Sequence, residues 1–194
     1  MSTDNFVLEP AAFLDMWQDK YFLGQEFLTW LWIYSEINGN FLNIKPQGEI
    51  ELWFESRLHL ESGEGGDKKS VTCQVPTAGR AEVSYDWAEA LTALRRAKKL
   101  TRGRLKISTE DKEWSLTLAA DTLTPQGVKF PKTFSSGEEE EDTETGQFLE
   151  RVALLNELMA IIESLFKQFL EIRLSPDWDM IELPRLNKWL AEQK

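Results

Sequence analysis

Two residue types that build metal sites and catalytic sites are almost missing from this chain of 194 residues. It has one cysteine, Cys73, and one histidine, His59. A single cysteine excludes an internal disulfide, which agrees with a reducing compartment such as the cytoplasm. One histidine without a cysteine or a second histidine at ligand spacing does not make a zinc site. Cys73 alternates with Val71 and Val75, which indicates a buried thiol rather than a nucleophile.

Long apolar runs, a secretion signal and a phosphate-binding loop are also missing. The longest apolar stretch, near Phe27–Tyr34, is too short to span a bilayer. No basic stretch precedes an apolar one at the N-terminus, so no signal peptide is predicted. The glycines at 63, 65 and 66 are not followed by a helix that starts with Lys-Ser or Lys-Thr. We therefore expect a cytoplasmic protein that is not an enzyme, with no cofactor, no metal, no membrane contact and no evident small-molecule substrate.

Positive charge is scarce, since 22 Lys and Arg stand against 33 Asp and Glu and the formal charge is −11. Such a charge repels nucleic acid and anionic membranes over long range. Within twelve positions that contain no acid, however, lie seven basic residues, here called the basic cluster: Arg95, Arg96, Lys98, Lys99, Arg102, Arg104 and Lys106. The cluster is the candidate nucleic-acid-binding site, and its contact with phosphates would be local and sensitive to salt. The alternative is a solvated helix end followed by an exposed strand face.

Alternating apolar and polar residues predict an antiparallel sheet of about five strands. Glu49–Leu60 places apolar residues on one face and charged residues on the other, which is typical of a strand with one face in water. A hairpin partner is predicted around Val71–Val75. A second hairpin joins Arg102–Ser108 to Glu113–Ala120, and a short strand follows at Gly127–Phe130.

Helical periodicity predicts three or four helices around this sheet. The clearest ranges are Gln25–Ile37, Ser84–Lys98, Gln147–Leu174 and Leu183–Glu192. Together the elements predict a single α+β domain over residues 1–194, with a flexible acidic loop at 135–146 where like charges repel one another.

Three groups of side chains carry alternatives that the sequence leaves open. The aromatic residues of 30–34 form either core or a ligand pocket. The carboxylates at 49, 51 and 55 either bind a hard cation or face water and pair with bases. The acidic run at 138–144 is either a solvated loop or an arm that mimics DNA.

The predicted helix Gln147–Leu174 carries a long apolar stripe. Its residues recur at alternating spacings of four and three: Phe148, Val152, Leu155, Met159, Ile162, Phe166 and Phe169. A stripe of this kind packs on a sheet, on another helix or on a second subunit. The helix is therefore the candidate surface for a protein partner or for a homodimer.

The order of several sequence segments in this chain resembles that of a known protein family. They are Arg95–Leu105, Glu113–Leu118, Gly127–Phe130, an acidic stretch and a helix over Leu149–Leu170. This order resembles the C-terminal part of the bacterial RdgC family of recombination-associated proteins. The segment Phe22–Trp32 is similar to one found in shorter RdgC-like proteins.

The resemblance implies a non-enzymatic protein associated with DNA recombination. RdgC forms a ring-shaped dimer, binds duplex DNA without sequence preference and restrains RecA-driven recombination. No functional residue of that family is carried over to a position of this chain. The leading hypothesis is weak, sequence-independent contact with duplex DNA through the basic cluster. The alternative is a protein-interaction or self-associating module that acts through the long C-terminal helix.

Overall fold

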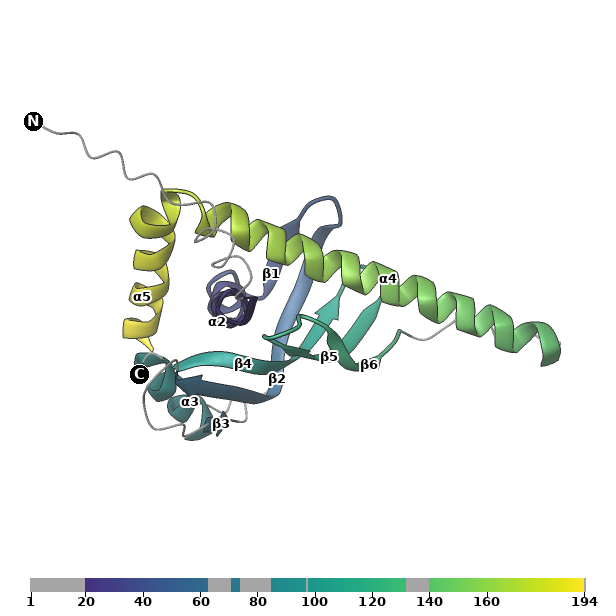
Figure 1. Cartoon of the computed structure of the whole chain (residues 1–194), viewed down its shortest axis with the longest axis horizontal. Helices are drawn as coiled ribbons and strands as arrows, with labels where there is room; N and C mark the ends of the chain where they lie inside the picture. The colour runs from purple at the N-terminus through teal and green to yellow at the C-terminus, as the bar shows by residue number, and fades with distance from the viewer. Residues whose placement is uncertain (1–19, 63–70, 74–84, 97, 132–139, 194) are drawn as a thin grey trace, which may run out of the picture.

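The computed structural model describes residues 20–62, 71–73, 85–96, 98–131 and 140–193. Within these ranges the chain forms a six-stranded antiparallel sheet and four α-helices (Figure 1). Five strands follow the order β1-β2-β4-β5-β6, and β3 pairs with β2. The predicted α+β class is therefore confirmed.

The sheet is built around two long strands, β2 and β4. Its members are β1 (Phe41–Ile44), β2 (Gly48–Ser62), β3 (Val71–Cys73), β4 (Lys98–Ser108), β5 (Glu113–Ala119) and β6 (Pro125–Lys129). Leu52 pairs with Ile107 and Phe54 with Leu105, which places the apolar residues of both strands on one face. The register shifts twice along the pair, and such bulges increase the local twist of a strand.

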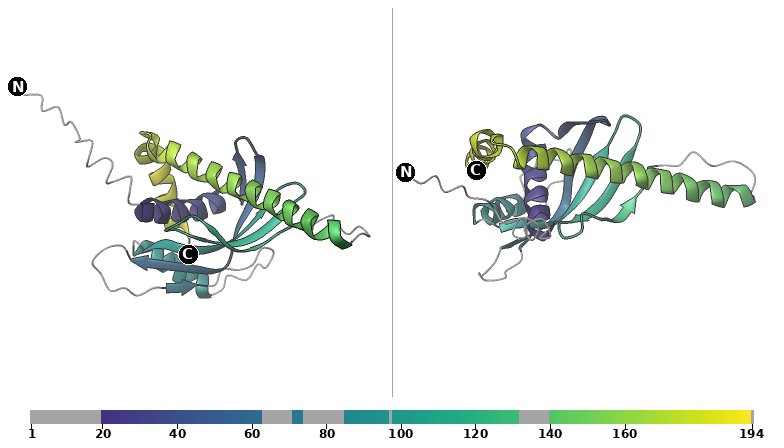
Figure 2. Two further views of the ribbon diagram at one scale, coloured as in Figure 1. Left: turned by 45° about the vertical axis from the view of Figure 1, so that its right-hand side comes forward. Right: turned by 45° about the horizontal axis from the view of Figure 1, so that its top comes forward.

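The helices lie on both sides of the sheet, but unequally. They are α2 (Lys20–Ile37), α3 (Tyr85–Arg95), α4 (Glu140–Arg173) and α5 (Leu183–Glu192), with a π-helical turn η1 (Trp178–Glu182) before α5. Helices α2, α4 and α5 cover one face, whereas α3 lies on the other side beside β3 (Figures 1 and 2). No helix in the described ranges is long and apolar enough to cross a membrane.

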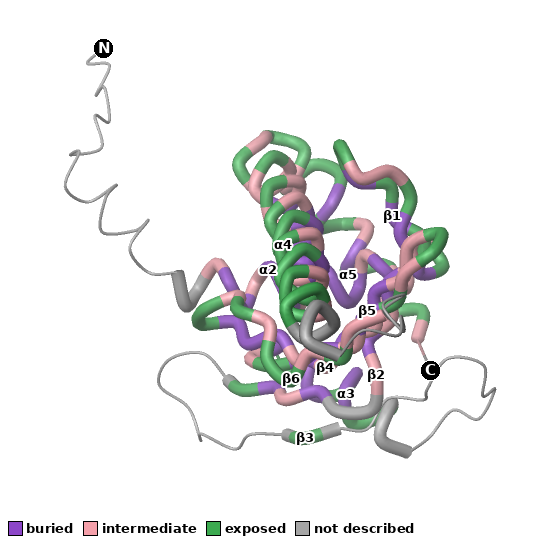
Figure 3. Tube along the Cα trace, turned by 90° about the vertical axis from the view of Figure 1, so that its right-hand side faces the viewer, coloured by how far each residue is buried: buried purple, intermediate pink, exposed green. Residues whose placement is uncertain are grey.

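The core fills the space between the sheet and the α2–α4 layer, where the buried positions gather (Figure 3). The rings of Phe27 of α2 and Phe166 of α4 pack edge to face with their centroids 5.1 Å apart. The ring centroids of Trp30 and Phe169 are 5.4 Å apart. Trp32 and Trp114 are also buried. The aromatic run of α2 is thus mainly core, as large rings contribute most buried area per residue.

Several predicted boundaries are wrong. Helix α2 begins at Lys20 instead of Gln25, and β4 begins at Lys98 instead of Arg102. The helix predicted to reach Lys98 ends at Arg95, because Lys98–Leu100 pair with the far end of β2 and this ladder outweighs the helix propensity of lysine. The acidic segment predicted as a loop is helical from Glu140 onward. Acids in a first helical turn are favoured by the helix dipole, so they extend α4 rather than end it. The rest of that predicted loop, 135–139, lies outside the described residues.

Candidate functional site

The basic cluster spreads over two elements that face different neighbours. Arg95 and Arg96 end α3, and the other five residues lie along β4. The Arg95 guanidinium donates hydrogen bonds to the backbone carbonyls of Leu190, at 3.1 Å, and Gln193. Carbonyls at a helix C-terminus attract cations, so Arg95 fixes the end of α5.

Three members of the cluster form ion pairs, two of them with acids that are distant in sequence. The Lys99 ammonium lies 3.2 Å from Glu26 on α2. The same Glu26 carboxylate also pairs with Arg173 of α4, at 3.0 Å. Strand neighbours supply the other two pairs, Arg104 with Glu55 at 3.7 Å and Lys106 with Glu113 at 2.8 Å.

The pairing of Lys106 stabilises its charged form. Its hydrogen bond to Glu113 raises the pKa of the Lys106 ammonium above its usual value, because the carboxylate stabilises the charged form. The DNA hypothesis requires basic side chains on one surface without acids among them. In the folded protein acidic side chains lie among these basic ones, although the sequence of the cluster contains no acid.

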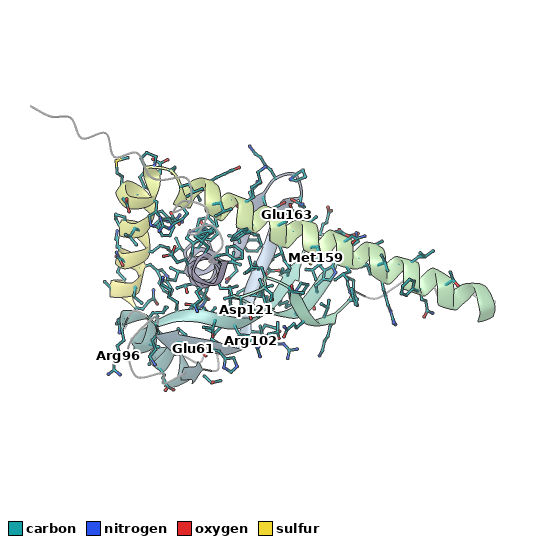
Figure 4. All side chains as sticks on the ribbon, viewed as in Figure 1. Glu61, Arg96, Arg102, Asp121, Met159 and Glu163 are labelled. Carbon is teal, nitrogen blue, oxygen red and sulfur yellow. The ribbon has the colours of Figure 1, made fainter. Side chains whose placement is uncertain are left out.

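Arg96 and Arg102 are the cluster members most exposed to water besides Arg95. Neither forms an ion pair with a described carboxylate within 4.0 Å. Figure 4 shows Arg96 at the end of α3, and Arg102 near Glu61 and Asp121. Arg102, Glu61 and Asp121 line a hollow of about 290 Å³ together with His59. Even Arg102 therefore has carboxylates beside it.

The lone histidine and the row of carboxylates on β2 also have ordinary partners. His59 Nδ1 lies 3.0 Å from the Thr72 hydroxyl on β3. Glu51 accepts a hydrogen bond from the Trp53 indole at 2.7 Å, and Glu55 is the partner of Arg104. In the described ranges no three His, Cys, Asp or Glu side chains are arranged to hold a metal ion.

Folding brings further carboxylates close to one end of the row on β2. Glu49 and Glu51 line a hollow of about 670 Å³ with Glu110, Asp111 and Glu157, between two hairpin ends and α4. At this hollow the Lys112 ammonium pairs with Glu157 at 2.9 Å, which raises the pKa of Lys112. The hollow attracts cations in general, but it has no arrangement that selects one.

Helix α4 has one face in the core and another in water. Leu158, Ile161, Leu165 and Phe169 are buried against the rest of the fold. Earlier in the helix, Phe148 is 65% exposed and Leu149 is 60% exposed, and Val152 and Met159 are each 39% exposed. With the half-buried Leu155 they form what we call the apolar stripe of α4. Sequence periodicity identified most of this stripe but not which part of it is free.

The stripe is exposed partly because α4 is longer than the sheet, and partly because Val152 and Met159 lie on a different side of the helix from the buried Leu154 and Leu158. Its 34 residues span about 51 Å at 1.5 Å per residue. The N-terminal part extends past the strands, and its surface is green in Figure 3 almost all round. No other described element covers Phe148 or Val152, so these side chains are available to a partner.

Comparison with known proteins finds no relative. No protein-family model, no curated protein and no solved structure matches this chain. The resemblance to the RdgC family therefore stays a prediction that rests on the order of sequence pieces.

Proposed function

We propose that this protein is a non-enzymatic interaction module that binds another protein through the apolar stripe of α4. The observation that carries the proposal is the exposure of Phe148, Leu149, Val152 and Met159 on one helix. Single exposed apolar residues are normal on protein surfaces, but a contiguous apolar strip bordered by polar residues is typical of an interface.

The spacing of the stripe indicates what kind of partner fits. Alternating steps of four and three residues allow side chains to enter the gaps of a facing helix. An amphipathic helix laid along such a face is a recurrent mode of protein recognition. Each Å² of apolar surface that the partner covers contributes roughly 25 cal/mol.

The other half of α4 holds the stripe in a fixed position. Ile161, Leu165 and Phe169 anchor the helix in the core. The ion pair of Lys112 with Glu157 and the hydrogen bond from Gln47 Nε2 to the Ala160 carbonyl, at 3.3 Å, add polar ties. A surface on a rigid element loses little conformational entropy on binding, which favours affinity.

The proposal is tested by protection of a cysteine on the stripe. In a Cys73→Ser background, Val152→Cys is labelled with a thiol reagent in dilute purified protein and in an extract of the source cells. We expect labelling in the extract to slow about tenfold, the factor reached when nine-tenths of the chain is bound.

The substitution Lys188→Cys is the control, because Lys188 is exposed and lies on α5, away from the stripe. Its labelling rate should be the same in both samples. Equal rates for Val152→Cys in extract and in dilute protein would contradict the proposal.

A second, weaker proposal keeps the RdgC-like function, namely association with DNA recombination through weak contact of the basic cluster with duplex DNA. The exposure of Arg96 and Arg102 favours it. The ion pairs of Lys99, Arg104 and Lys106 and the net charge of −11 weigh against it.

A salt titration of binding to duplex DNA tests this second proposal. Each phosphate contact adds about 0.9 to the slope of log affinity against log salt, so the double substitution Arg96→Ala/Arg102→Ala should lower that slope by about 2. Lys188→Ala on α5 is the control and should leave the slope unchanged, since Lys188 lies outside the cluster. Absence of binding at low salt would rule the proposal out.

A further inference from the structure

We infer that the protein bound by the apolar stripe is a second copy of this chain, and that the two α4 helices pair antiparallel about a centre between Ala153 and Leu154. This inference rests on the proposed function, because it names the partner of the same surface. The argument uses the register of the stripe, the position of the sheet and the distribution of charge.

The register makes the stripe complementary to its own reversed copy. When two identical helices run antiparallel, residues equally far from the centre meet. Phe148 then faces Met159 of the second copy, and Val152 faces Leu155. These contacts give four apolar layers. In each layer a residue from one of the two apolar positions of the seven-residue repeat packs against a residue from the other position, as in antiparallel helix pairs. The flexible methionine can adapt to the ring of Phe148.

The position of the sheet favours the same direction. Each copy packs its own sheet and α2 against the C-terminal half of α4, around Ile161–Phe169. In an antiparallel pair the two sheets lie at opposite ends of the helix pair, and each projecting N-terminal part meets free surface (Figure 1). In a parallel pair both sheets would lie at the same end and compete for space.

Few charged residues border this contact, although the exposed Glu163 follows one helical turn after Met159. The stripe contains no charged residue, and Glu157 points away from it toward Lys112. Arg151 comes to the height of the uncharged Asn156 of the second copy. Repulsion comes from the acids beside the contact, Glu150 at the height of Glu157 and Glu163 after Met159, and from the charge of −11 on each chain, and salt screens both. Self-association should therefore tighten as salt is added.

The area of the stripe sets the expected strength. A large apolar side chain buries on the order of 150–250 Å² when fully covered, and the members of the stripe are already partly covered. The interface is therefore at the small end of the range for specific complexes, and we expect a dissociation constant of roughly micromolar order.

Disulfide trapping tests the partner and the direction together. Phe148→Cys and Met159→Cys are made separately in the Cys73→Ser background, mixed at equal amounts and mildly oxidised. We expect the mixed disulfide to form at least about tenfold faster than either symmetric one. Faster formation of the symmetric Phe148→Cys disulfide would indicate parallel pairing and overturn the inference. So would the absence of any disulfide above the level given by Lys188→Cys.

Labelling of purified Val152→Cys at increasing protein concentration separates this inference from the proposed function. Protection that grows with concentration supports both. Protection that appears only in the cell extract overturns the second copy as partner and leaves the proposed function in place. Protection that is the same at every concentration means that the same chain covers the stripe, and it overturns the inference.

Discussion

Replacing Gly24 with alanine should destabilise the protein by about 3 kcal/mol or more, although the same change normally stabilises a helix by up to about 1 kcal/mol. A Cβ atom at Gly24 of α2 would lie 1.8 Å from the backbone oxygen of Ala120. A backbone atom cannot rotate away, so α2 would have to move off the turn after β5. Urea denaturation followed by circular dichroism measures the change in the free energy of unfolding.

Gly146 provides the matched control, since it also lies in a helix. A Cβ atom there has no neighbour within 4 Å. Gly146→Ala should therefore stabilise the protein by up to about 1 kcal/mol, because alanine loses less backbone entropy on folding than glycine. If both substitutions stabilise the protein, the close approach of α2 to Ala120 is wrong.

Replacing Trp30 with phenylalanine should cost about 3 kcal/mol, the second-largest effect that we expect. The Trp30 indole donates a hydrogen bond of 2.8 Å to Glu182 Oε1, and Glu182 is only 6% exposed. Phenylalanine fills most of the same space but leaves this buried carboxylate with the more distant Arg185, at 3.6 Å. The lost bond links α2 to the turn before α5, 152 residues away.

A double-mutant cycle shows whether the cost comes from this bond. Glu182→Gln keeps an acceptor for the indole and should cost less than Trp30→Phe. Trp30→Phe combined with Glu182→Leu should cost clearly less than the sum of the single changes, since it leaves neither polar group unpaired. Additive costs would mean that packing, and not the hydrogen bond, holds the two elements together.

The DNA proposal and the inferred pairing of two copies respond to salt in opposite directions. Contact of the basic cluster with DNA weakens as salt rises, because the entropy gained by releasing bound counterions falls when the bulk salt concentration is higher. Pairing of two chains of charge −11 through an uncharged stripe strengthens, because their mutual repulsion is screened. One salt series on the purified protein, with and without DNA, therefore distinguishes them.

Much of the fold was predictable from local patterns. The alternation over 49–60 identified β2, and the bounds predicted for the last helix agree with α5. Strand β1 was missed because its four residues are too few to show a period. The end of α3 and the start of α4 depend on strand pairing and on the helix dipole, which composition alone does not reveal.

The positions of the candidate sites were predictable from the sequence, but their ion pairing and their exposure to water were not. A basic run without acids is visible in the sequence, yet the acids that pair with it lie at positions 26, 55 and 113 and arrive only through folding. Likewise the stripe of α4 was visible, but its exposed part depends on where the sheet ends and on which side of the helix packs against the core. Both differences come from contacts between residues far apart in the chain.

Glu26 has a consequence for both candidate surfaces. Its carboxylate bonds Lys99 of the basic cluster on one side and Arg173 of α4 on the other. Lys99 lies on β4 and Arg173 at the C-terminal end of α4, so Glu26→Gln would remove one anionic partner from a cation on each element. A single carboxylate of α2 thus sets part of the charge that both β4 and α4 present.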